Sequence, residues 1–160
     1  MSTNLVEQKI PGASDLAEDL MGTWRLLSYE SLHHTGEMVI PYTDKPNGRL
    51  IYTKDGDFSI HFHHPDRPKY TSMDPIDAKA DECHLNFLFY CSYFGKYELL
   101  EDEMAVIHHV EGASFPNWDG EDQKRFIEYD GKQLKLVTPE MIIRGDRVVG
   151  TLRWERLYQV

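Results

Sequence analysis

Hydrophobic and polar residues alternate along most of this chain, in short runs that are separated by turn residues. Alternation at a period of two is typical of half-buried β-strands, whereas a helix repeats about every 3.6 residues. The pattern predicts about eight strands, without any βαβ unit, and this favours a closed antiparallel β-barrel. The expected strands, with one short extended piece at 38–40, cover residues 23–30, 49–53, 57–63, 95–100, 104–113, 123–129, 133–138 and 148–156.

Turn residues set the expected pairing of the hairpins. The Asp-Gly pair at 55–56 is a two-residue hairpin signal, and a second such pair lies at 130–131. A three-residue loop over 101–103 would place His109 and Glu111 on the face that Tyr97 occupies. For the strand over 57–63, the alternation does not decide which face points into the barrel.

Two helices are expected beside the strands. A short helix covers 14–20, after a polar stretch without periodicity, and apolar residues at helical spacing predict a longer helix over 75–93. One long helix among many strands is expected to pack across or beside the barrel mouth. The predicted organisation is a flexible leader over 1–13 and one barrel domain over 14–160.

Composition narrows the function. A chain of 160 residues, 41% hydrophobic and 28% charged, is typical of one globular domain. The formal net charge of −10 argues against nucleic-acid binding, which needs clustered Lys and Arg. The chain has no apolar run long enough to span a membrane and no apolar signal segment, so we expect a cytoplasmic protein without a membrane partner.

Cys83 and Cys91 both fall in the longer predicted helix, about 12 Å apart, which is too far for a disulfide. Reduced thiols are consistent with the cytoplasmic location. No phosphate-binding glycine loop, dinucleotide fingerprint or serine nucleophile elbow is present, so we expect no cofactor.

Gly22-Thr23-Trp24 opens the first strand, and a basic residue, Arg153 or Arg156, lies on the last. This combination resembles the lipocalin signature, in which the tryptophan closes the barrel floor and the arginine packs across it. The chain is similar to the bacterial and fungal lipocalin-like domain family over about residues 20–157. Such barrels include carriers as well as cofactor-free isomerases, cyclases and lyases, so the resemblance implies the fold more than the function. The matching segments are 22–29, 48–56, 93–98, 108–112, 115–118 and 154–156.

Polar residues in the predicted strands form the candidate active site. Glu111 or His109 would be the general base, and Tyr93 or Tyr97 the acid. Arg125 shares a face with leucines and would stabilise an oxyanion together with Asn117, or form a buried pair with Glu111 in a purely structural network. The residues expected to bind the substrate are Tyr52, His61, Asn117, Trp118 and Phe87.

Three functions are compatible with these residues. The first is a cofactor-independent isomerase, cyclase or lyase that acts on a small apolar or aromatic metabolite. The second is a carrier or sensor, in which the same polar groups only orient the ligand. The third is a metal enzyme that uses His61 and His63, but no glutamate follows at cupin spacing, so we expect no metal. The sequence leaves a homodimer open.

Overall fold

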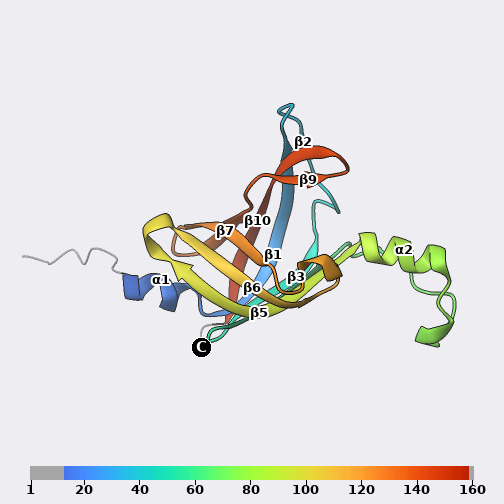
Figure 1. The fold of residues 1–160 in the computed structure, drawn as a ribbon, viewed down its shortest axis with the longest axis horizontal. Helices are drawn as coiled ribbons and strands as arrows, with labels where there is room; N and C mark the ends of the chain where they lie inside the picture. The colour runs from blue at the N-terminus through green and yellow to red at the C-terminus, as the bar shows by residue number, and fades with distance from the viewer. Residues whose placement is uncertain (1–12, 159–160) are drawn as a thin grey trace, which may run out of the picture.

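The computed structural model describes residues 13–158, so the leader predicted over 1–13 lies, apart from Ala13, outside the described residues. Eight antiparallel strands form a barrel, which closes where the first strand pairs with the last (Figure 1). This confirms the fold predicted from the alternation. In order around the wall, the strands are β1 (Gly22–His33), β3 (Asn47–Tyr52), β4 (Asp57–His63), β5 (Tyr90–Leu100), β6 (Ala105–Ala113), β7 (Asp122–Tyr129), β8 (Gln133–Val137) and β10 (Asp146–Tyr158).

Two short strands extend the wall at one end of the barrel. β2 (Met38–Val39) pairs with the end of β1, and β9 (Met141–Ile143) pairs with the start of β10. The first matches the predicted extended piece, whereas the second was not predicted. Both project from the barrel end that lies away from helix α1 (Ala13–Leu20) (Figure 1).

The other end forms a closed floor. The Trp24 side chain is fully buried, and its Nε1 donates to the Leu20 carbonyl of α1 at 2.9 Å. The Arg156 guanidinium lies 4.3 Å from the centre of a Trp24 ring and donates to the Met21 and Asp19 carbonyls. Arg156, not Arg153, is therefore the late arginine that the lipocalin resemblance implies. These contacts fix the N-terminal helix against the barrel.

The helix predicted over 75–93 is wrong at both ends. The structure has a 3₁₀ turn, η1 (Pro75–Asp77), and a shorter helix, α2 (Ala80–Leu88). The strand β5 begins at Tyr90 because the residues from Tyr90 onward pair with β4. Cys83 and Cys91 therefore lie in different elements.

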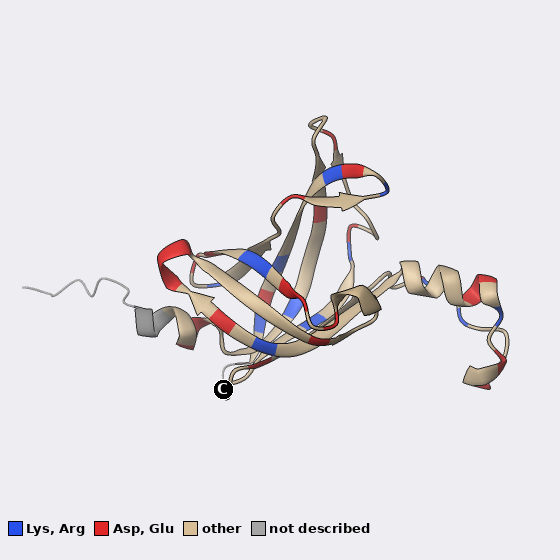
Figure 2. Cartoon of the chain, in the orientation of Figure 1, with Lys and Arg blue, Asp and Glu red and all other residues tan. Residues whose placement is uncertain are grey.

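Helix α2 does not cover the barrel mouth. It projects outward from the wall between β4 and β5 (Figure 1), and Asn86 is its only buried residue. The apolar side chains of Phe87 and Leu88 are 45% and 43% exposed. The prediction that this helix packs across or beside the barrel mouth is therefore wrong. Acidic residues lie on α2 and on the turn η2 (Glu101–Glu103) between β5 and β6 (Figure 2). None of the helices within residues 13–158 is long and apolar enough to cross a membrane.

Two of the three predicted hairpin registers, between β3 and β4 and between β5 and β6, are one residue off for the same reason. Each loop is one residue longer than expected and ends on a residue in the left-handed region, Gly56 (φ +84°) and Met104 (φ +47°). Tyr52 therefore pairs with Phe58, whereas a two-residue turn at 55–56 would have paired it with Ser59. A one-residue slip moves every side chain of a strand to the other face. The inner face of β4 is the apolar one, with the buried Phe58, Ile60 and Phe62.

Candidate functional site

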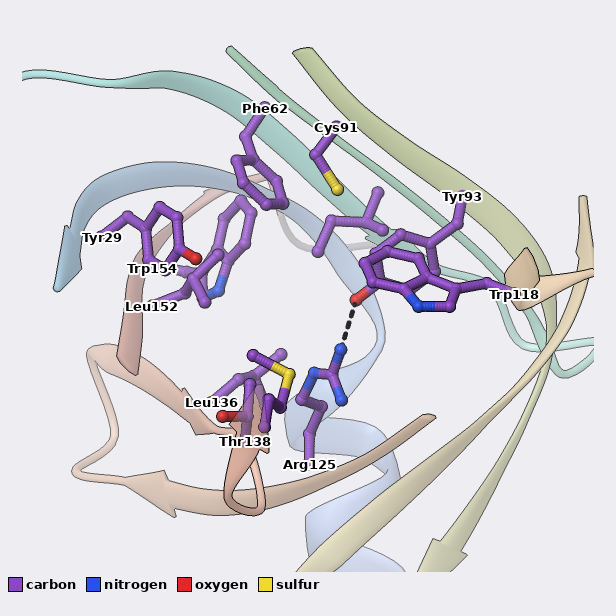
Figure 3. Close-up of a pocket in the computed structure, with 12 residues that line it drawn as sticks. Tyr29, Phe62, Cys91, Tyr93, Trp118, Arg125, Leu136, Thr138, Leu152 and Trp154 are labelled. Carbon is purple, nitrogen blue, oxygen red and sulfur yellow. Dashed lines mark hydrogen bonds between the residues drawn. The ribbon is translucent and has the colours of Figure 1, made fainter. Parts of the chain in front are cut away.

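A cavity of about 50 Å³ lies inside the barrel (Figure 3), and Met141 of β9 is one of its lining residues. Its wall is mostly aromatic and aliphatic, with a few hydrogen-bonding groups. Of the predicted site residues, Tyr93, Trp118 and Arg125 line it. The other lining residues are Tyr29, Ile60, Phe62, Cys91, Leu136, Thr138, Met141, Leu152 and Trp154.

Arg125 is a buried cation in this wall. It lies on β7, two residues before Ile127, and shares the inner face with Leu134 and Leu136, as its position among leucines predicted. Only 6% of the residue is exposed. The alternation of β7 therefore directs its guanidinium into the apolar cavity.

The guanidinium of Arg125 has neutral hydrogen-bond partners. It donates to the Lys124 carbonyl at 2.7 Å, to Gln123 Oε1 at 3.4 Å and to the Tyr93 hydroxyl at 3.3 Å (Figure 3). Among the side chains that the structure describes, residues 16–158, no carboxylate lies within ion-pair distance of it. The predicted pairing with Glu111 is wrong because Glu111 is exposed on the outer face of β6.

Tyr93 carries the second polar group of the cavity. Its ring packs edge to face against Trp118, with centroids 5.5 Å apart. Burial raises the pKa of the Tyr93 hydroxyl, and the charge of Arg125 partly offsets that rise. The oxygen accepts a hydrogen bond from Arg125, so the hydroxyl hydrogen stays available to a further acceptor.

The remaining polar groups of the wall can also donate. Thr138 Oγ1 accepts from the Gly150 amide at 2.8 Å, which leaves its hydroxyl hydrogen free. The indole Nε1 of Trp154 is buried and has no partner within the described part of the chain. Burial raises the pKa of the Tyr29 hydroxyl. The wall thus offers several donors around one apolar space.

Cys91 lines the cavity with a thiol, not a thiolate. Desolvation by burial raises its pKa to about 12, although the nearby charge of Arg125 acts in the opposite direction. A thiol with that pKa is protonated at neutral pH and is a poor nucleophile. Cys91 therefore serves as a small apolar wall residue, whereas Cys83 on α2 is exposed.

Another aromatic layer lies on the inner face without lining the cavity. His108 is fully buried, stacks on Phe58 with centroids 4.2 Å apart, and has its Nε2 at 2.6 Å from the Tyr52 hydroxyl. Burial lowers the pKa of His108 well below 6.5. Tyr97 is half-buried beside Tyr52 and donates to the Thr53 carbonyl at 2.9 Å. The predicted residues Tyr52 and Tyr97 belong to this packed layer.

The structure places the other predicted site residues outside the barrel. His109 lies between Asp122 (2.6 Å) and Glu98 (3.3 Å) on the outer surface, where hydrogen bonding to these acids raises its pKa. His61 is exposed and contacts Ser59 and Tyr90. Asn117, on the turn η3 (Pro116–Trp118), and Phe87, on α2, are also exposed. Within the described residues, no group of three or more His, Cys, Asp or Glu could hold a metal ion.

The comparison with protein families agrees with this architecture. Residues 21–157 match the lipocalin-like domain. The chain belongs to this family. A protein of Aspergillus oryzae (strain ATCC 42149 / RIB 40), named 4'-hydroxy-3'-methoxypropiophenone carrier protein ppsC, is 27% identical to this lipocalin-like chain over 100 residues. That alignment covers 58% of the chain and 90% of the carrier protein.

A lipocalin-like barrel with an internal apolar cavity is an architecture for binding small molecules. The polar groups of this cavity are hydrogen-bond donors together with one cation. A carboxylate or imidazole is absent from the described lining. Such a wall can orient an oxygen acceptor, but it lacks a side chain that would remove a proton from a bound molecule at neutral pH.

Several lining residues of this lipocalin-like domain were not identified from the sequence. Tyr29 follows a register irregularity in β1 between Leu26 and Ser28, which shifts the inward positions from even to odd numbers, so simple alternation assigns it to the wrong face. Phe62 and Trp154 occupy inward positions of β4 and β10. They are core residues whose rings also form the cavity wall, and alternation alone does not separate these two roles.

Proposed function

We propose that this lipocalin-like protein is a non-catalytic carrier of a small aromatic molecule that bears a hydrogen-bond acceptor oxygen. The observation that carries the proposal is the buried pair of Arg125 and Tyr93, which directs donors into an aromatic cavity. Trp118 and Trp154 on the same wall would contact the ring of the ligand. The named carrier function of the relative from Aspergillus oryzae supports the same class of ligand.

A cofactor-independent isomerase, cyclase or lyase stays a prediction. Its proposed bases, Glu111 and His109, lie on the outer surface, and the buried His108 does not line the cavity. A general base must be within hydrogen-bond reach of the proton that it removes. A carrier function is therefore preferred, because it requires no general base in the cavity.

A ring-sized ligand requires the cavity to widen. Its volume is about 50 Å³, whereas a cavity of about 150 Å³ accommodates benzene. Met141 has a flexible side chain on the short strand β9, and Trp118 lies on the surface turn η3. These two residues are the wall elements that would move when a ligand enters.

Isothermal titration calorimetry with 4'-hydroxy-3'-methoxypropiophenone, the compound in the relative's name, tests this proposal. We expect saturable binding to one site. Arg125→Gln should weaken binding by about tenfold to a hundredfold, because a hydrogen bond to a charged group contributes about 1.5–3 kcal/mol. The matched variant Arg147→Gln, at a surface arginine paired with Glu140, should bind as the wild type does. Equal affinities for the two variants would exclude Arg125 from the site.

Recovery of the ligand separates a carrier from an enzyme. After prolonged incubation with substoichiometric protein, chromatography and mass spectrometry should return the ligand unchanged, with the same retention time. Glu111→Gln should not alter affinity because Glu111 lies outside the cavity. An isomeric or cyclised product that disappears with Glu111→Gln would instead establish the enzymatic alternative.

A further inference from the structure

The charge of Arg125 has a chemical consequence beyond orientation of a ligand. A guanidinium stays protonated in proteins, so its burial cannot be relieved by loss of a proton. Three of its four described hydrogen bonds are 3.3–3.4 Å long, at or beyond the usual limit of such bonds, and every acceptor is neutral. A buried charge is costly unless it is paired. Among the described residues, the cavity wall therefore presents a cation without a counter-charge.

Hydrogen-bond donors near Arg125 also favour a negatively charged ligand in the cavity. The Tyr93 oxygen accepts from Arg125, and its hydroxyl hydrogen is available to donate to an additional group in the cavity. Trp154 Nε1 is a donor without a partner among the described residues. No described carboxylate lines the cavity to repel an anion. Arg125 and Tyr93 can thus act together on one oxygen, in the manner of an oxyanion site.

We infer that the cavity binds its aromatic ligand as an oxyanion, with Arg125 and Tyr93 selecting the ionised form of an acidic oxygen. This inference rests on the proposed carrier function. The ligand class is an aromatic compound whose phenol is acidified by a conjugated carbonyl, or a corresponding enol or carboxylic acid. On binding, the O–H bond of the neutral ligand breaks, the proton passes to the buffer, and the oxygen keeps the electron pair.

The ionisation of a bound phenol can be followed directly in absorbance, because phenolate absorbs at longer wavelength than phenol. We would titrate 4'-hydroxy-3'-methoxypropiophenone with acid and base, free and bound to excess protein. The bound ligand should ionise at least about one pH unit below the free ligand, which corresponds to a tenfold preference for the anion. Arg125→Gln should abolish this shift, and Arg125→Lys should retain part of it.

The number of protons released on binding measures the ionisation of the ligand independently of absorbance. Calorimetry in two buffers with different ionisation enthalpies, at a pH below that of half-ionisation of the free ligand, should report release of up to about one proton per ligand bound. The 4'-O-methyl ether of the same ketone, which cannot ionise, should release none and bind at least about tenfold more weakly above the ionisation pH of the bound phenol.

The outcomes separate the inference from the carrier proposal. Tight binding of both phenol and methyl ether, without proton release or an absorbance shift, would overturn the inference and leave the carrier function standing. Absence of binding by either compound would count against both. If Arg125→Gln fails to fold by circular dichroism, Tyr93→Phe serves as the second variant. It should reduce the shift in the ionisation of the bound phenol, and an unchanged shift would contradict the shared oxyanion site.

Discussion

Adjacent histidines on β6 occupy opposite environments because successive side chains of a strand point to opposite faces. His108 points inward, is fully buried, and is kept neutral by burial, which lowers its pKa well below 6.5. His109 points outward and is hydrogen-bonded to Asp122 and Glu98, and these hydrogen bonds raise its pKa. The pKa values of two histidines that are adjacent in the sequence are thus shifted in opposite directions.

The two pKa shifts predict that the histidines contribute to the stability of the fold with opposite dependences on pH. The unfolded chain binds a proton at His108 as the pH falls below about 6.5, whereas the folded protein does not. The stabilising contribution of neutral His108 is therefore complete above that pH and is lost as the pH falls toward its folded-state pKa. His109 behaves in the opposite way, and its contribution is lost as the pH rises through its raised pKa.

Long-range proton–nitrogen NMR spectra of the imidazoles, recorded as the pH is lowered, measure both groups in the unmodified protein. His108 should remain neutral at a pH where His109 is already charged. Because the chain has eight histidines, His109→Gln assigns the outer ring by loss of its signal, and His108→Gln assigns the inner ring in the same way. A His108 ring that protonates at or above pH 6.5 would contradict its placement in the sealed inner layer.

At the level of elements, sequence alternation predicted the strands well and their registers poorly. The loop between β7 and β8 is two residues longer than predicted, which preserves the facing of every side chain, so the inward position of Arg125 was correct. The loop between β5 and β6 is one residue longer and ends on Met104 in the left-handed region, a conformation that Asn or Gly would have signalled. His109 and Glu111 were therefore assigned inward, whereas the structure places both on the outer face of β6.

The irregularity at Gly95 gives a prediction on the same hairpin. Here the register of β5 and β6 shifts, and a Cβ on Gly95 would lie 2.0 Å from the His109 carbonyl oxygen. Because that contact is with backbone, Gly95→Ala should lower the free energy of unfolding by about 3 kcal/mol or more. Urea denaturation followed by tryptophan fluorescence measures the change.

The control for that substitution is Gly56→Ala. Gly56 has φ +84°, and a Cβ there would have no neighbour within 4 Å. Only the left-handed conformation opposes the side chain, so the loss should be about 1–2 kcal/mol. Equal losses at Gly95 and Gly56 would show that the strands relax freely at the irregularity.

At the level of the whole molecule, the barrel assembles its cavity from residues that are distant in sequence. Tyr93 comes from β5, Arg125 from β7 and Trp154 from β10, and the closure of β1 onto β10 brings them around one space. The floor at Trp24 and Arg156 seals one end. We therefore expect a ligand to reach the cavity from the end where β2 and β9 project. Residue spacing could predict the barrel but not which inward residues share this space.

The most direct test of the central claim is an experimental structure of the complex with 4'-hydroxy-3'-methoxypropiophenone. We expect the aromatic ring inside the barrel, between Trp118 and Trp154, in a cavity widened by movement of Met141. A ligand oxygen should lie within hydrogen-bond distance, about 2.7–3.2 Å, of both the Arg125 guanidinium and the Tyr93 hydroxyl. A ligand bound on the outer wall or along α2, with Arg125 still bonded only to Tyr93, Gln123 and Lys124, would contradict a carrier site inside the barrel.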